Sequence, residues 1–256
     1  MTDTHMKWPD RYGRVILHEI DSTNAEAARR IGDLSGPTWI MARMQTAARG
    51  RRGRPWANPA GNFAATLVLR HPGAPGQAAL RSFTAALALH EAFVTATGRP
   101  GSFALKWPND VLLNGGKVAG ILLEGLHHGS GAHAQAGLAI GIGVNLAAAP
   151  DPGQVEPGAL RPVSLLSETG TAIDPEEFLN ILAPAYARLE SQFASYGFAP
   201  LRAAWLERAA RLGEPVTARM GSETVTGTFE TIDETGQLVL RGSHGVRRIT
   251  AAEIFF

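Results

Sequence analysis

The segment at residues 49–54, RGRRGR, has the residue types that bind phosphate. Its four arginines can each donate paired hydrogen bonds to a phosphate group, and its two glycines let backbone N–H groups approach an anion. A solvated basic loop or a nucleic-acid contact would use the same residues. The chain has no P-loop motif and no Gly-x-Gly-x-x-Gly motif after a strand, so the usual nucleotide-binding signatures do not explain this segment.

A second cluster, KWPND at residues 106–110, places a cation, an aromatic ring, a rigid turn and a carboxylate side by side. Lys117 follows across an Asn-Gly-Gly hairpin turn, so it can lie near this cluster. An ammonium flanked by arginines suits an anionic ligand, and Asp110 could hold a metal or accept a proton from an incoming amine. Alternatively, Asn109 and Asp110 form an Asx-type turn while the lysines face solvent.

Two further groups of polar residues have simple structural explanations. Ser22, Thr23 and Asn24 can cap a helix, with Thr23 and Glu26 as a capping box, although the same hydroxyl and amide groups could read a small polar ligand. Three histidines fall in a Gly-rich hairpin tip without partner carboxylates, so we expect no permanent metal site there. They are His127, His128 and His133.

The composition excludes several classes of protein. The chain has no cysteine, so disulfides, thiolate metal sites and a cysteine acyl-enzyme are impossible. No apolar run approaches the roughly 20 residues that span a bilayer, and the N-terminus lacks a signal-peptide apolar region, which predicts a cytoplasmic protein without membrane contact. A net charge of +1 argues against a dedicated nucleic-acid binder, although seven arginines and no acidic residue lie between Asp33 and Glu91.

The pattern of the chain predicts a large domain and a small one. Gly, Pro and Asn indicate loops at 47–62 and 147–162, and short alternating strands after Gly213 indicate a small β-barrel that must pack on the larger domain. Strands are expected at 14–20, 39–45, 63–70, on both sides of the 114–116 turn and at 138–146, with helices after residue 24 and at 77–97, 174–195 and 198–211.

Taken in order, these motifs resemble the biotin protein ligases over essentially the whole chain. The matching segments are DSTNAEA (21–27), Gln45, RGRRGRPW (49–56), KWPNDVLL (106–113), GGKVAGILLE (115–124) and IGIGVNL (140–146). The resemblance implies an α+β fold. A mixed β-sheet flanked by helices, like that of class II aminoacyl-tRNA synthetases, would form a catalytic domain at 1–212, and a small SH3-like β-barrel would follow at 213–256.

The resemblance also implies a two-step reaction. ATP, as its Mg²⁺ complex, and biotin form biotinyl-5′-AMP, which then acylates a lysine of a biotin carboxyl carrier protein such as an acetyl-CoA carboxylase subunit. About 13 residues precede the first strand, too few for the DNA-binding domain of some members, so we expect no repressor activity and no nucleic-acid partner. Exposed sheet edges make a homodimer possible. Lipoate ligases share the fold and remain the nearest alternative.

The site residues implied by the resemblance fall into three sets. Biotin would contact Ser22, Thr23, Asn24, Gln45, Arg49, Gly50, Arg51 and Lys117. ATP and the adenylate would contact Arg49, Arg51, Arg52, Trp56, Asn109, Lys117 and Asn145. Lys117, Asp110 and Arg51 would be catalytic. Ala48 replaces a glycine that is common before RGRRG in the family, which would stiffen the loop.

Overall fold

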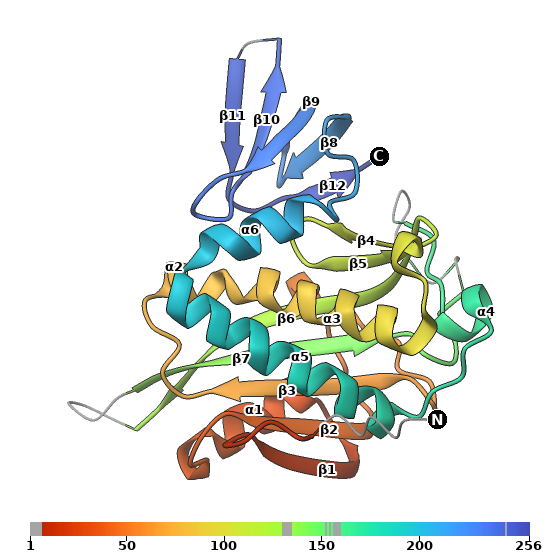
Figure 1. Ribbon diagram of the computed structural model, residues 1–256, viewed down its shortest axis with the longest axis vertical. Coiled ribbons are helices and arrows are strands. Elements are labelled where there is room, and N and C mark those ends of the chain that lie inside the picture. The colour runs from red at the N-terminus through yellow and green to blue at the C-terminus, as the bar shows by residue number, and fades with distance from the viewer. Residues whose placement is uncertain (1–6, 130–134, 152, 154, 156–159, 244) are drawn as a thin grey trace.

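The computed structural model describes residues 7–129, 135–151, 153, 155, 160–243 and 245–256. Its larger sheet has seven strands in the order β1-β2-β3-β7-β6-β5-β4 (Figure 1). β1 and β2 are parallel and every other neighbouring pair is antiparallel, so the sheet is mixed as predicted. The strands are β1 (Gly13–Ile20), β2 (Thr38–Gln45), β3 (Phe63–Leu69), β4 (Phe103–Lys106), β5 (Asp110–Leu113), β6 (Gly116–His128) and β7 (Gln135–Val144).

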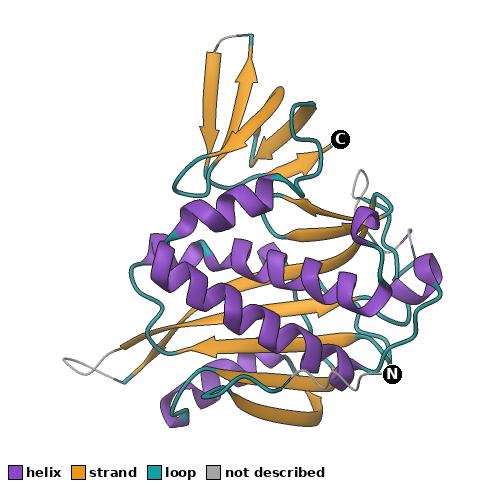
Figure 2. Cartoon of the chain, viewed as in Figure 1, coloured by secondary structure: helices purple, strands orange, loops and turns teal. Residues whose placement is uncertain are grey.

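Helices cover both faces of this sheet. α3 and α5 pack against each other on one face, and α1 packs on β2, β3 and β7 on the other (Figures 1 and 2). Buried aromatic side chains, including Phe93, Phe103 and Phe178, fill the layer between α3, α5 and the sheet. The helices are α1 (Thr23–Arg30), α2 (Pro75–Ala79), α3 (Arg81–Thr97), α4 (Leu165–Thr169), α5 (Pro175–Tyr196) and α6 (Phe198–Leu206), with 3₁₀ turns at Ile31–Asp33, Arg51–Gly53 and Pro100–Ser102.

The C-terminal domain is a second, antiparallel sheet in the order β11-β10-β9-β8-β12. Val216, Phe229 and Ile254 of this sheet belong to the same buried core as α3 and α5, so the small domain packs firmly on the large one. β11 and β12 are its two edges and do not pair with each other, so the hydrogen-bonded sheet is open where we expected a closed barrel. The strands are β8 (Pro215–Met220), β9 (Glu223–Ile232), β10 (Leu238–Gly242), β11 (Gly245–Ile249) and β12 (Glu253–Phe255).

Three details of the predicted helices were wrong. Thr23 and Glu26 do not form a capping box: Ser22 is the N-cap, Thr23 hydrogen-bonds Gln45, and Glu26 pairs with Arg29 and Arg30. The predicted helix at 77–97 is two helices, α2 and α3, and α6 ends earlier than expected. Among the described residues, no helix combines the length and apolar character needed to cross a bilayer.

Candidate active site

A cavity of about 620 Å³ lies between the N-terminus of α1, the arginine loop (residues 49–54), the middle of β6 and β7, and β12. This volume is in the usual range for small-molecule sites. All thirteen site residues named from the sequence line it, although they come from segments far apart in the chain. They are Ser22, Thr23, Asn24, Gln45, Arg49, Gly50, Arg51, Arg52, Trp56, Asn109, Asp110, Lys117 and Asn145.

Two glycines of β7 allow other side chains to lie directly on the sheet. A Cβ at Gly141 would be 2.4 Å from Oδ1 of Asn24, and a Cβ at Gly143 would be 2.6 Å from Cε2 of Trp56. Both distances are far below normal contact, so any larger residue would displace these side chains.

Uncharged polar groups line the part of the cavity nearest α1. The backbone N–H of Thr23 donates to Oε1 of Gln45 at 2.8 Å, which joins the start of α1 to the end of β2. Buried Thr66 on β3 lies 2.8 Å from the Thr23 hydroxyl and 2.6 Å from Oδ1 of Asn24. These side chains are fixed before any ligand arrives and offer hydrogen bonds without net charge.

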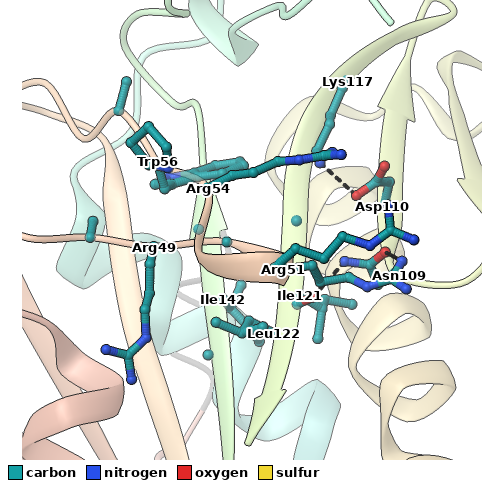
Figure 3. Close-up of a pocket in the computed structure, with 18 of the residues that line it drawn as sticks. Arg49, Arg51, Arg54, Trp56, Asn109, Asp110, Lys117, Ile121, Leu122 and Ile142 are labelled. Atoms are coloured by element: carbon teal, nitrogen blue, oxygen red, sulfur yellow. Dashed lines mark hydrogen bonds and ion pairs between the residues drawn. The ribbon is translucent and has the colours of Figure 1, made fainter. Parts of the chain in front are cut away.

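The arginine loop folds back on itself. The Gly50 N–H donates to the Arg54 carbonyl at 2.7 Å, and the Trp56 N–H donates to the Ala48 carbonyl at 3.0 Å. Arg52 has a φ of 58°, in the left-handed region, which turns the chain sharply. The loop thereby projects its guanidinium groups in different directions, with Arg51 toward β5 and Arg49 on the opposite side of the cavity (Figure 3).

Asp110 is the centre of a buried charge cluster at the start of β5. Its Oδ1 is 2.7 Å from Nζ of Lys117, and its Oδ2 is 3.8 Å from Nζ of Lys106 (Figure 3 shows the first pair). Burial alone would raise the pKa of Asp110, but Lys117, Lys106 and Arg51 together hold it below its ordinary value. Asp110 is therefore ionised in the resting site.

Burial changes the two other cations of this cluster. It lowers the pKa of Lys106, an effect that Asp110 partly opposes. It also lowers the pKa of Arg51, which donates to Oδ1 of Asn109 at 3.2 Å and lies 3.5 Å from the carbonyl of Ala252. A poorly hydrated cluster of cations favours a multiply charged anion such as a polyphosphate.

Trp56 lies on the floor of the cavity against Gly143 and Gly120. The Nζ of Lys117 is 5.5 Å from the centroid of its ring, within range of a cation–π contact. The indole therefore presents an aromatic face next to the charged cluster, as a planar base would require.

Two predicted residues also have clear structural contacts. The amide of Asn109 donates to the Ile121 carbonyl at 2.7 Å while it accepts from Arg51. Asn145 is buried, and its Nδ2 donates to the Val163 carbonyl at 3.1 Å. Both amides hold neighbouring backbone in place at the cavity wall.

Sequence reasoning missed three residues that line the cavity, Lys106, Arg54 and Glu253, and one beside it, Glu124. Lys106 and Glu124 stood inside quoted motifs without a role, and Arg54 within the basic segment was not assigned. Glu253 on β12 gave no local signal, yet it accepts hydrogen bonds from Arg54, Arg52 and Arg219. The hydrogen bond from Arg54, reinforced by the other two arginines, lowers the pKa of Glu253 to about 2.

Among the described residues, no three His, Asp or Glu side chains are grouped as metal ligands. His127 and His128 lie at the end of β6, and His133 is outside the described part of the chain. The charges in this cavity that could hold an anionic ligand are those of the arginine loop and the two lysines.

Two family models match this chain. Residues 12–145 match the biotin/lipoate A/B protein ligase family, and residues 212–256 match the biotin protein ligase C terminal domain. The chain belongs to the biotin/lipoate A/B protein ligase family, which confirms the family and the fold class expected from the motifs.

Individual relatives agree with this assignment. The chain is 61% identical over 241 residues to a biotin–[acetyl-CoA-carboxylase] ligase of Paracoccus denitrificans, covering 94% of this chain and 99% of that one. It is 31% identical over 227 residues to the bifunctional ligase/repressor BirA of Escherichia coli, covering 88% and 68%. Among solved structures, the biotin protein ligase from Aquifex aeolicus in complex with biotin and ATP matches with a TM-score of 0.79 and 26% identity, covering 94% and 97%.

Proposed function

We propose that this chain is an ATP-dependent biotin protein ligase. It forms biotinyl-5′-AMP from biotin and Mg²⁺-ATP and transfers the biotinyl group to a lysine of a biotin carboxyl carrier protein. The observation that carries this proposal is one cavity with two kinds of lining. Uncharged readers at Thr23, Asn24 and Gln45 suit the ureido ring of biotin, and the cations around Asp110 suit the phosphates.

In the first step, a carboxylate oxygen of biotin attacks the α-phosphorus, and the bond from that phosphorus to the pyrophosphate oxygen breaks. Negative charge builds on the α-phosphate and on the leaving group. Arg51 is held on the cavity wall by its contact with Asn109, and Lys117 turns from Asp110 to the phosphate, so both donors stabilise this charge. Trp56 offers its ring to the adenine.

In the second step, the carrier lysine attacks the acyl carbon of the mixed anhydride, and AMP leaves. We assign to Asp110 the role of accepting the proton that the attacking amine loses as the amide forms. In the resting site Asp110 is paired with Lys117. The proposal therefore requires Lys117 to turn from this carboxylate toward the ligand, which frees Asp110 for the acceptor.

We extend the proposal to organisation and location. Residues 1–212 form the biotin- and ATP-binding domain and residues 213–256 the SH3-like domain. A cytoplasmic location suits an enzyme that uses ATP and a carrier protein. β5 pairs with β6 only between Gly116 and Gly120, which leaves one edge of β6 beyond Ile121 unpaired within the described chain and available to a second copy.

The test is incubation with ATP, Mg²⁺, biotin and a purified carrier domain, followed by intact mass spectrometry. We expect the carrier to gain one biotinyl group and a carrier with its target lysine replaced by arginine to gain none. A parallel arm measures ATP–pyrophosphate exchange with lipoate in place of biotin. Exchange that depends on lipoate instead would assign the chain to the lipoate branch. A protein that forms no adenylate, and whose affinity for nucleic acid falls steeply as the salt concentration rises, would overturn the proposal.

A further inference from the structure

Glu124 holds two residues of the cavity from outside it. Its side chain lies on β6 and is not among the residues that line the cavity. One carboxylate oxygen, Oε2, accepts from Nδ2 of Asn24 at 2.6 Å, and the other, Oε1, accepts from Nη2 of Arg49 at 3.1 Å. Glu124 thus joins the polar end of the cavity to the first arginine of the loop.

An ionised carboxylate can only accept hydrogen bonds, so this contact fixes the orientation of the Asn24 amide. The NH₂ group faces Glu124, and Oδ1 faces the Thr66 hydroxyl at 2.6 Å. A rotated amide would place its oxygen against the carboxylate, which is repulsive. Asn24 and Thr66 are both buried, so little water competes for the hydrogen bond between them.

The orientation of Asn24 then sets the hydroxyl protons beyond it. Oδ1 of Asn24 has no proton, so the single proton of Thr66 must make this contact. The 2.8 Å contact between the Thr66 and Thr23 hydroxyls then uses the proton of Thr23, which the same hydroxyl shares with Oε1 of Gln45 at 3.2 Å. The lone pairs of the Thr23 oxygen are left to accept from a donor in the cavity.

We propose that Glu124 is a positioning residue that makes the polar end of the cavity an acceptor of a ligand N–H. The inference rests on the proposed function, since the ligand is then the cyclic urea of biotin with its ring N–H donors. Glu124 acts on the urea of the ligand through Asn24, Thr66 and Thr23. Its second contact, to Arg49, places the arginine loop in the same network.

The first experiment compares wild type with Glu124→Gln in biotin-dependent ATP–pyrophosphate exchange. A glutamine side chain can also donate, so the amide of Asn24 loses its fixed orientation. We expect the KM for biotin to rise about tenfold, the size of one charge-assisted hydrogen bond, while kcat changes less than about threefold. For biotin methylated on a ureido nitrogen, Glu124→Gln should raise the KM less. The preference of the enzyme for biotin over this analogue should therefore fall.

A double variant separates positioning from a merely structural role. In Asn24→Asp with Glu124→Gln, the glutamine amide can donate to the new carboxylate, which still accepts from Thr66. We expect the double variant to have a KM for biotin close to that of the wild type. Asn24→Asp alone places two carboxylates together, so this single variant should bind biotin poorly. Glu91→Gln is the matched control, because Glu91 pairs with Arg188 on the surface, away from the cavity.

The outcomes are distinguishable. A Glu124→Gln enzyme with the wild-type KM for biotin and the wild-type preference over the methylated analogue would overturn the inference and leave the proposed function standing. A lower melting temperature with unchanged KM would do the same, since it would show a structural role alone. No biotin-dependent exchange in the wild type would overturn the proposed function and this inference with it.

Discussion

Replacing Gly141 with alanine would place a methyl group against the amide of Asn24. The new Cβ would be 2.4 Å from Oδ1, which is roughly 1 Å inside normal contact. Asn24 cannot move away freely, because Glu124 and Thr66 hold the two ends of its amide at 2.6 Å. Overpacking of this kind costs about 1–3 kcal/mol. If this cost falls on the site, biotin binding weakens about 5- to 150-fold.

Gly143 provides the matched comparison two residues along the same strand. Its Cβ would meet Cε2 of Trp56 at 2.6 Å, so Gly143→Ala should displace the indole instead of the amide. We expect Gly141→Ala to raise the KM for biotin and Gly143→Ala to raise the KM for ATP, each with less than about a threefold change in the other constant.

Steady-state ATP–pyrophosphate exchange measures both constants, and thermal unfolding checks that both variants remain folded. Neither glycine has a positive φ, so alanine is compatible with the backbone at both positions. The reasoning would be refuted if Gly141→Ala weakened ATP as much as biotin, or if both variants kept wild-type constants for both substrates.

Three further predictions concern charged residues. Lys117→Ala should slow adenylation by orders of magnitude, and near-normal pyrophosphate exchange in this variant would contradict its role. Arg51→Gly should shorten the time for which biotinyl-AMP stays bound, measured by its release from the isolated complex; wild-type retention would show that Arg51 is misassigned. Glu253 has a folded-state pKa of about 2, below its ordinary 4.5, so its ion pairs stabilise the fold above pH 4.5 and lose that effect as the pH falls toward 2. The melting temperatures of wild type and Glu253→Gln should therefore differ at pH 7 and converge near pH 2; a gap that stays constant would exclude this origin.

The sequence predicted which residues line the cavity better than it predicted the hydrogen bonds and ion pairs between them. RGRRGR, KWPND and Lys117 are local motifs whose residue types already indicate an anion site, and each contributes residues to the cavity lining. The paired strands around the 114–116 turn and the β7 glycines also have local signals. The mixed character of the sheet has no local signal in the sequence, and its prediction came from the resemblance to the family.

Contacts between distant segments were outside the reach of pattern reasoning. Glu253 lies about 200 residues from Arg52 and Arg54, and nothing near it in the sequence indicates that it binds them. The capping box failed for a similar reason: Gln45, on another strand, competes for Thr23. Local sequence indicates which hydrogen bonds a side chain can form, and tertiary contacts determine which of them it does form.

The contacts of Glu253 also bear on the ionic atmosphere around the site. Arg52 and Arg54 have a carboxylate partner that belongs to the protein itself. When a polyphosphate binds these arginines, it displaces Glu253 and releases fewer dissolved anions than it would from arginines without a carboxylate partner. The affinity should therefore depend on salt concentration less steeply than four arginines would suggest. The small C-terminal sheet thus serves as a built-in counterion, which lets the chain carry a dense run of guanidinium groups while reducing their attraction for nucleic acid.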